Sequence, residues 1–383
     1  MILIPTYIKV LLITIIISML ISCIDPYEAN LGNPNKVLVV EGLLTDDNNN
    51  PDTLKIQYSI DVGGVVKREP VKATQARIWL NSTNQPIQLI EKGEGIYLPP
   101  PNFKINPSEK YTLRFTLPDN QQYESTPQQI IPTPSISNIH ENFNFKSRLS
   151  ADGKRFLSAN EIFVDFQDEA NQKNFYLWQY THYERLSYCA TCDNQLYDFD
   201  SQSCVDKSRL AGLNRPEPYY DYVCLEDCYA IFRSKNVNVL SDIASDGRLI
   251  KGRLVAKIPF YSFSGCVVEI KQMCISPETY NFYKVLESQS QTTGGLADTP
   301  PAAIVGNIKN VNNPTEKIVG TFFVAEVKKK RIWLDRANAS GPTDLVLGHI
   351  IVPEPQSGPP FRPPPARCKP SATRTNIKPE GWQ

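Results

Sequence analysis

Short stretches of alternating apolar and polar residues recur along most of the chain and predict β-strands. The alternation is clear at residues 54–60, 76–80, 162–166 and 175–183, and a continuous apolar run fills residues 37–44. Clusters of Pro, Asn, Asp and Gly separate these stretches, as turns do between strands. Because successive side chains of a strand point to opposite faces, each alternating stretch can bury one face. The pattern therefore predicts an all-β protein.

The strand signals fall into two groups. Residues 36–132 contain no cysteine and predict a β-sandwich of about seven strands. Residues 130–134 have no periodicity and contain two prolines, so we place a domain boundary there. We expect residues 135–350 to form a larger β-rich domain. Its later strands are predicted at residues 231–240, 249–258, 267–273, 303–308, 318–327 and 332–334.

One stretch of the second half predicts a short helix. Ser276 can cap its start, Pro277 suits the first helical position, and Glu278 favours the positive end of the helix dipole. Gly294 and Gly295 are expected to end it. Regular alternation stops at residues 184–234, which we interpret as an insert held by disulfides rather than by a large core.

The N-terminus predicts export. Lys9 precedes an apolar run at residues 10–21, which is shorter than the ~20 residues of a spanning helix but suits a signal peptide. The run ends in Leu-x-Ser-Cys at Cys23, which resembles a bacterial lipobox. We expect residues 1–22 to be removed, Cys23 to be lipidated and residues 23–35 to form a tether. Two or three acyl chains would anchor the protein firmly to the outer membrane, on its periplasmic face or at the cell surface. An ordinary signal peptide or a short membrane anchor is the alternative.

The composition of the chain narrows the classes of molecule that we expect as partners. The chain has 383 residues with 40 basic and 40 acidic side chains, and this balance disfavours nucleic acid as a partner. An even set of cysteines in an exported chain predicts disulfides, although their pairing stays open. The tail at residues 351–383 is rich in proline, and we expect Cys368 to pin it. The eight candidates for disulfides are Cys189, Cys192, Cys204, Cys224, Cys228, Cys266, Cys274 and Cys368.

The residues around the first cysteines resemble three kinds of chemical site. His182 and Glu184 followed by Cys189-x-x-Cys192 are similar to the zinc deaminase signature, but the spacing is too short for the elements that carry such ligands. A structural zinc on Cys189, Cys192, Cys224 and Cys228 is possible by spacing, and so is a redox-active pair. In an oxidising compartment disulfides are the better interpretation. We therefore expect no metal, no cofactor and no catalytic residue.

Tyr219, Tyr220 and Tyr222 are the candidate binding residues. Clustered tyrosines on a stapled loop offer a large contact area at low entropic cost. The alternative is that they cover the disulfides.

Motifs spread along the chain resemble one family. They are Cys23-Ile24-Asp25-Pro26-Tyr27-Glu28, Leu38-Val39-Val40-Glu41-Gly42-Leu43-Leu44-Thr45, Asn174-Phe175-Tyr176-Leu177-Trp178, Ser276-Pro277-Glu278-Thr279-Tyr280, Gly294-Gly295, Val305-Gly306-Asn307-Ile308, Ile318-Val319-Gly320 and Arg374-Thr375-Asn376-Ile377-Lys378-Pro379-Glu380-Gly381-Trp382. In this order they resemble the DUF4249 family of exported bacterial lipoproteins, in its cysteine-rich subset. The resemblance implies an Ig-like sandwich followed by a larger β-rich domain, and a partnership with outer-membrane TonB-dependent receptors.

The expected function is therefore a non-enzymatic accessory module that binds or docks, with a TonB-dependent receptor as its partner in nutrient uptake. Two other classes stay open. One is a hydrolase of glycans or peptides whose carboxylates the sequence does not single out. The other is a structural surface protein or adhesin. The ligand is not predicted.

Overall fold

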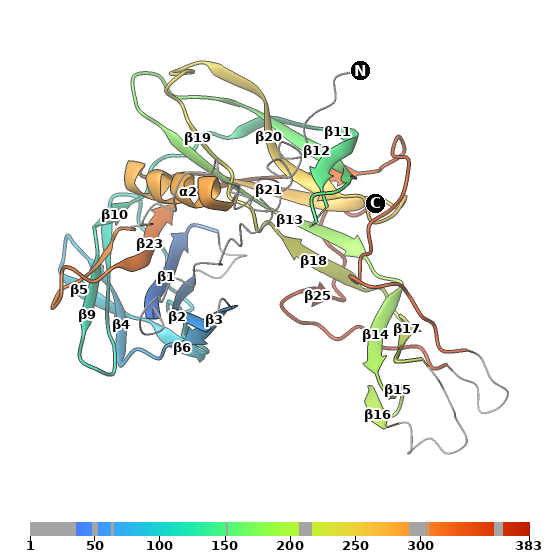
Figure 1. The fold of residues 1–383 in the computed structure, drawn as a ribbon. Helices are drawn as coiled ribbons and strands as arrows, with labels where there is room; N and C mark the ends of the chain where they lie inside the picture. Colours follow the sequence, from blue (N-terminus) through green and yellow to red (C-terminus); the bar gives the residue numbers. More distant parts are fainter. Residues whose placement is uncertain are drawn as a thin grey trace, which may run out of the picture.

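Strands form nearly all of the regular structure in the computed structural model (Figure 1). It describes residues 36–47, 53–62, 65–150, 152–206, 217–290, 304, 306–355 and 363–383. Within these residues α2 (Pro277–Ser290) is the one helix. The prediction of an all-β protein is confirmed. The lipidation site Cys23 lies outside the described residues.

The first sandwich is built from two sheets. One has the order β23-β1-β2-β7-β6 with β3 beside β2, and the other has the order β22-β9-β8-β4-β5 with β10 beside β8. The strands of this part are β1 (Lys36–Thr45), β2 (Thr53–Val62), β3 (Val65–Pro70), β4 (Gln75–Leu80), β5 (Gln85–Gln88), β6 (Ile90–Gly93), β7 (Ile96–Leu98), β8 (Lys110–Thr116), β9 (Gln122–Ser125) and β10 (Gln128–Gln129).

The alternating apolar residues of these strands form the core between the two sheets. Leu38 and Val40 of β1 meet Ile78 of β4 and Leu113 of β8, and all four are buried. The Tyr123 ring stacks on Phe115 of the neighbouring strand, with 4.8 Å between ring centroids. The likeness of this sandwich to an immunoglobulin fold stays a prediction.

Two strands from late in the chain complete the first sandwich. β22 (Ile308–Asn310) pairs with β9, and β23 (Ile318–Ala325) runs parallel to β1. The assignment of Ile308 and residues 318–325 to the sheet of the second domain is therefore wrong, whereas Val327 belongs to β24 of that sheet. The pattern of an apolar strand indicates that it is buried but not which sheet buries it, and here Leu38 pairs with Ile318, far along the chain.

The second sandwich packs a three-stranded sheet on a larger one. The smaller sheet consists of β11 (Ile136–Leu149), β12 (Phe156–Gln167) and β20 (Leu249–Pro259). Its core residues, among them Ile162 and Phe166, pack on Tyr176 and Trp178 of the other sheet. That sheet has the order β24-β21-β13-β18-β25 with β19 beside β13. Its strands are β13 (Phe175–Arg185), β18 (Tyr229–Arg233), β19 (Val239–Ser241), β21 (Cys266–Cys274), β24 (Val327–Leu334) and β25 (Arg374–Thr375).

A separate apolar cluster and α2 join the two sandwiches. The Thr279 N–H donates to the Ser276 hydroxyl at 3.2 Å, which confirms the predicted cap of the helix. Tyr283 of α2 packs beside Phe323 of β23 and Leu177 of β13 in this cluster. The predicted glycines at the end of the helix lie outside the described residues.

A buried ionic group lies at the same junction. Asp47, just after β1, accepts hydrogen bonds from Lys271 at 3.0 Å and from Lys329 at 2.6 Å. Both lysines belong to the sheet of the second sandwich. The junction is therefore both packed and ion-paired, so the two sandwiches share one rigid contact.

A narrow arm leaves the second sandwich after β13 and returns at β18 (Figure 1). Its strands form two small hairpin-like sheets, in which β14 pairs with β17 and β15 with β16. They are β14 (Tyr188–Asp193), β15 (Gln195–Asp198), β16 (Ser203–Asp206) and β17 (Tyr219–Val223). The arm lies within the insert predicted from the loss of alternation.

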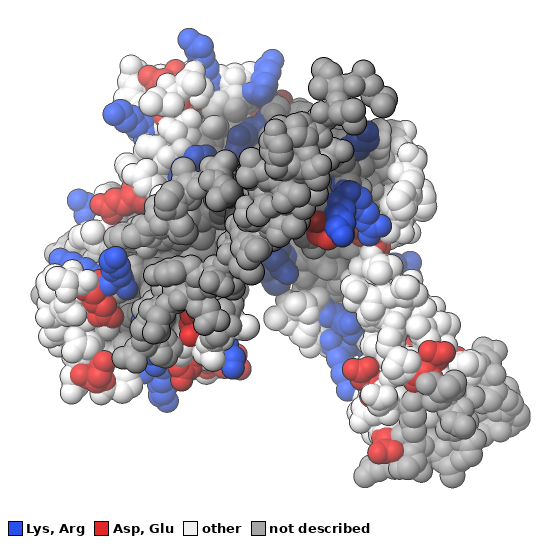
Figure 2. All heavy atoms as spheres, viewed as in Figure 1, with Lys and Arg blue, Asp and Glu red and all other residues white. Residues whose placement is uncertain are grey.

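Basic and acidic side chains are interspersed on the face shown in Figure 2, without a large area of one sign. Of the residues that the structure describes, no helix combines the length and apolar character needed to cross a membrane.

Candidate functional site

Three disulfides hold the arm and connect it to the tail. Cys189 pairs with Cys224, Cys192 with Cys204, and Cys228 with Cys368. The first two close the arm on itself. The third spans 140 residues and ties the tail to the base of the arm, as predicted for Cys368. Each bridge restricts the unfolded chain and stabilises a region with little core, commonly by ~2–4 kcal/mol.

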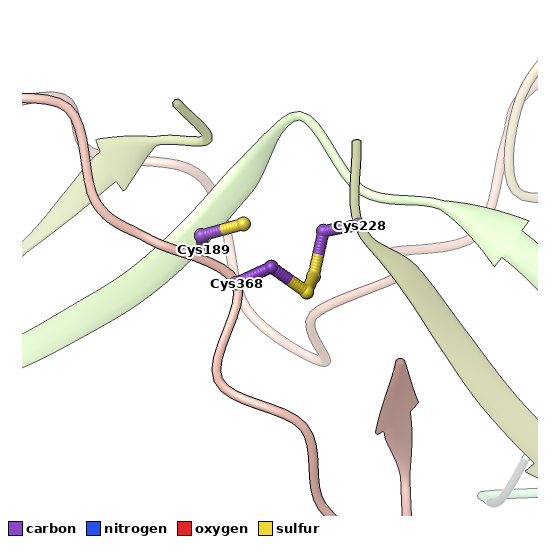
Figure 3. Close-up of side chains that lie close together, drawn as sticks. All are labelled: Cys189, Cys228 and Cys368. Atoms are coloured by element: carbon purple, nitrogen blue, oxygen red, sulfur yellow. A yellow bond between two sulfur atoms is a disulfide. The ribbon is translucent and has the colours of Figure 1, made fainter. Parts of the chain in front are cut away.

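The sulfur of Cys189 lies next to the bridge between Cys228 and Cys368 (Figure 3). A group of three close cysteine sulfurs could suggest a metal site. Each of these sulfurs is already in a disulfide, so none is a free thiolate of the kind that zinc binds. The four cysteines of the alternative zinc site, Cys189, Cys192, Cys224 and Cys228, are all in disulfides.

Cys266 and Cys274 are not bridged, which contradicts the prediction for these two residues. They lie at opposite ends of β21, and a strand rises about 3.3 Å per residue, so their sulfurs cannot meet. Both are buried in the core of the second sandwich. Burial raises the pKa of Cys274 to about 12 and raises the pKa of Cys266 as well, with the Glu184 charge adding to the effect at Cys266. Both thiols therefore stay protonated.

The tyrosine cluster covers the disulfides rather than facing solvent. Tyr220 and Tyr222 are fully buried and belong to the small core of the arm, together with Cys189 and Cys192. The Tyr222 hydroxyl donates to Glu354 at 2.7 Å. The half-buried Tyr219 donates to the Ile350 carbonyl at 2.9 Å. The tyrosines therefore fasten the tail to the arm, and the prediction of a binding role for Tyr220 and Tyr222 is wrong.

A cleft of about 600 Å³ lies where the arm meets the second sandwich. Its walls come from the end of β13, the end of β17 and the segment after it, the residues between β20 and β21, and the stretch that contains Val346, Leu347 and Ile351. Apolar side chains on its rim are exposed to solvent, with Val223 at 51%, Leu225 at 47% and Ile351 at 41%. Its remaining lining includes Glu184, Arg185, Glu226, Asp227, Tyr261 and Ser262. The cleft therefore combines exposed apolar side chains with polar side chains, of which Arg185, Glu226 and Asp227 are exposed and Glu184 is buried.

A buried ion pair joins Glu184 of the cleft wall to Arg336. Arg336 donates to both carboxylate oxygens of Glu184, at 2.6 Å and 3.0 Å. It also donates to the carbonyls of Pro259, Ser262 and Ser264 at 3.1–3.3 Å. Burial opposes the charge of Arg336, but the hydrogen bonds and charge of Glu184 outweigh it and raise the pKa of Arg336. The guanidinium therefore stays charged and ties three segments together.

Arg336 has a left-handed backbone with φ of 59°. Side chains other than glycine rarely adopt this conformation, and it persists only where the surroundings hold it. The five hydrogen bonds of the guanidinium are such a constraint. The sequence did not single out Arg336, because nothing near it in the chain indicates a partner at residue 184.

His182 lies beside this pair, with its Nε2 atom 3.9 Å from the Glu184 carboxylate. Its ring stacks on Phe232 at 4.8 Å, and neither ring nitrogen has a hydrogen-bond partner among the described residues. Burial, with the Arg336 charge, lowers the pKa of His182 to about 3. With Glu184 bound to Arg336 and both cysteines of the motif in disulfides, the deaminase-like arrangement is not formed.

Two face-to-face sandwiches and a disulfide-held arm define an all-β protein with a cleft at the base of the arm. The model of the family described as Domain of unknown function (DUF4249) matches residues 24–331, and the chain belongs to this family.

A search of curated proteins finds no match. Among solved structures, the chain is similar to the one titled "Structure of alpha-L-rhamnosidase from Dictyoglumus thermophilum". The identity is 10%, the TM-score is 0.18, and the match covers 65% of this chain and 28% of that chain. A likeness at this level carries no argument about fold or activity.

Proposed function

We propose that the protein is a lipid-anchored accessory docking module at the outer membrane, and that the cleft at the base of the arm is its docking surface. The partner proposed is a TonB-dependent receptor in nutrient uptake, as the family resemblance implies. The observation that carries this proposal is the exposed apolar rim of Val223, Leu225 and Ile351 beside a polar cleft. Apolar anchors next to polar groups are the usual composition of a protein interface.

The chemistry of the cleft supports docking rather than turnover. Glu184, the buried acid of its lining, is held by Arg336 in a bidentate ion pair. His182 is buried, and its lowered pKa leaves the ring uncharged near neutral pH. A general acid or base must reach its substrate and exchange protons near the working pH. Neither group meets this requirement.

Rigidity of the surface supports the same proposal. Two disulfides close the arm, and a third joins the base of the arm to Cys368 of the tail. A surface held in one conformation loses little entropy when a partner binds. The disulfides would therefore increase affinity without contacting the partner.

The test is recovery of a receptor from outer-membrane fractions with an affinity-tagged full chain. We expect the tagged chain in that fraction together with a β-barrel receptor identified by mass spectrometry. Leu225→Glu should reduce the recovered receptor at least about tenfold, because a charge in an apolar contact is costly. Ile243→Glu is the matched control, since Ile243 is 89% exposed and follows β19 at the far end of β13. Failure to recover any β-barrel, or equal recovery with both variants, would contradict the proposal.

A further inference from the structure

Two arginines lie directly opposite each other on the outer face of the first sandwich. The register of β4 and β8 pairs Arg77 with Arg114, while their neighbours Ile78 and Leu113 point into the core. Side chains opposite each other on antiparallel strands are close, and like charges in such pairs are destabilising. The pair therefore needs an explanation beyond the stability of the sandwich.

Neighbouring side chains orient both guanidinium groups through their Nε atoms. Arg77 Nε donates to Gln88 Oε1 at 2.9 Å, and Arg114 Nε lies 2.9 Å from Glu124 Oε2. The Arg114 guanidinium also lies over the ring of Trp79, 4.8 Å from its centroid. Within the described chain, no hydrogen bond or ion pair engages the terminal Nη atoms of either arginine. Two oriented guanidinium forks are thus left with unused donors.

The two arginines line a groove of about 230 Å³ on this face. Gln75, Thr116 and Gln122 line the same groove and contribute amide and hydroxyl groups. The groove is separate from the cleft at the base of the arm. Figure 1 shows β4, β5 and β9 on the side of the molecule away from the arm.

The charge of this face is unbalanced toward positive. The row of cross-strand partners consists of Gln88, Arg77, Arg114, Glu124 and Lys309, so it holds three basic side chains and one acidic side chain. Glu124 is bonded to Arg114, and Arg77 has no acidic partner among the described residues. An added anion would offset the repulsion between the arginines.

We propose that this groove binds an oxyanionic group, a carboxylate, sulfate or phosphate, carried by a small polyhydroxylated ligand. Arginine forks match the geometry of such groups and bind them through paired hydrogen bonds. The side chains of Gln75, Thr116 and Gln122 would then hydrogen-bond to the hydroxyls of the ligand. This binding site adds to the docking function and does not depend on it.

Calorimetric titration of the full chain in detergent, at constant ionic strength, tests the site. The probes are galacturonate, galactose 6-sulfate and inorganic phosphate, with galactose as the neutral comparison. We expect binding of at least one anionic probe and no measurable binding of galactose. Comparison of the three anions shows which oxyanion the site prefers. If galacturonate binds more tightly than phosphate, the difference shows the contribution of the hydroxyl contacts. Binding of galactose as tight as that of galacturonate would overturn the proposal.

Variants identify the residues responsible. Arg77→Gln and Arg114→Gln should each weaken binding at least about tenfold, because each removes a charge-assisted pair of hydrogen bonds. Lys309→Gln is the matched control, since it removes one positive charge from the same row without touching the groove. It should keep affinity within about twofold of the parent chain. An equal loss in all three variants would indicate only long-range attraction and would overturn the site.

Stability separates a binding role from a structural one. Without ligand, Arg77→Gln should melt at the same temperature as the parent or higher, because it removes the repulsion between opposed like charges. Loss of binding in a variant of undiminished stability supports the site. A lowered melting temperature together with unchanged anion binding would show that the arginines serve the sheet alone. Receptor recovery plays no part in these measurements, so failure here is distinguishable from failure of the docking proposal.

Discussion

At the scale of single residues, the second sandwich contains polar groups that its core tolerates for different reasons. Glu184 and Arg336 are buried as a bidentate pair, so each satisfies the charge of the other. His182 is buried without any hydrogen-bond partner among the described residues and is stable there only as the neutral ring. The neighbours of each group therefore determine whether it is buried as a charged pair or as a neutral ring.

His182 should make the protein sensitive to acid. Its pKa falls from 6.5 to about 3 on folding, so between these values the unfolded chain binds the proton more strongly. The contribution of His182 to stability is therefore fully present above pH 6.5 and is lost progressively as the pH falls toward about 3, by on the order of 1 kcal/mol for each pH unit. His182→Phe keeps an aromatic ring beside Phe232 and should remove this part of the acid loss. Urea unfolding of both proteins across this pH range is the measurement.

His140→Phe is the control for this prediction, because His140 is exposed on β11 and stacks on Phe163. Its variant should keep the pH dependence of the parent chain. If His182→Phe and the parent lost stability equally on acidification, His182 would not be the group responsible.

At the scale of elements, β23 depends on close backbone contacts. Gly320 has a φ of +133°, and a Cβ there would lie 1.8 Å from the Val40 carbonyl oxygen. Asn307 fastens Phe322, two residues further along the strand, since its amide donates to the Phe322 carbonyl at 2.7 Å and accepts from the Phe322 N–H at 2.9 Å. The motif residues Asn307 and Gly320 therefore provide close contacts at the place where β23 pairs with β1.

Gly320→Ala should destabilise the protein severely, by roughly 3 kcal/mol or more, because the methyl group meets a carbonyl that belongs to the sheet. Gly341→Ala is the control, since Gly341 also has a positive φ but no atom within 4 Å of the added Cβ. Its loss should be limited to backbone strain, about 1 kcal/mol. Equal losses in urea unfolding for the two variants would show that the close approach of β23 to β1 is not what matters.

At the scale of the whole molecule, the tail closes the fold. Cys368 is bridged to Cys228, β25 pairs with β18, and the Trp382 ring packs edge-on against Tyr229 and Trp333, with centroids 4.7 Å and 5.2 Å apart. Of the described residues of the tail, Ile351 at its start lines the cleft at the base of the arm. The bridge, β25 and Trp382 fasten the end of the tail to the second sandwich.

Removing the bridge with Cys228→Ser and Cys368→Ser together should loosen this tail. A bridge across 140 residues restricts the unfolded chain more than one across 12, so the expected loss is roughly 4 kcal/mol, against about 3 for Cys192→Ser with Cys204→Ser. Trypsin should then cut after Arg374, which is half-buried in the parent and donates to the Cys189 carbonyl. The control pair should leave this bond protected. Protection of Arg374 in both double variants would argue that strand pairing, not the disulfide, holds the tail.

Much of the architecture follows from local pattern. The strands β1, β2, β4, β12, β13, β20 and β21 lie where alternation or apolar runs predict them, because a strand with one buried face must alternate. The cap at Ser276 and the six bridged cysteines also follow from sequence, since the cap is a local pattern and the number of cysteines is a matter of composition. β11 was missed because its side chains are mostly exposed and do not alternate cleanly.

Tertiary structure alone decided what these elements meet. Only the folded chain shows that β23 returns to β1 and that Tyr220 and Tyr222 are enclosed. The pairs Glu184 with Arg336 and Arg77 with Arg114 also appear only there, because their members lie far apart in the chain. The physical reason is the same in each case. Periodicity indicates whether a side chain is buried, but the residue that it contacts depends on the path of the rest of the chain.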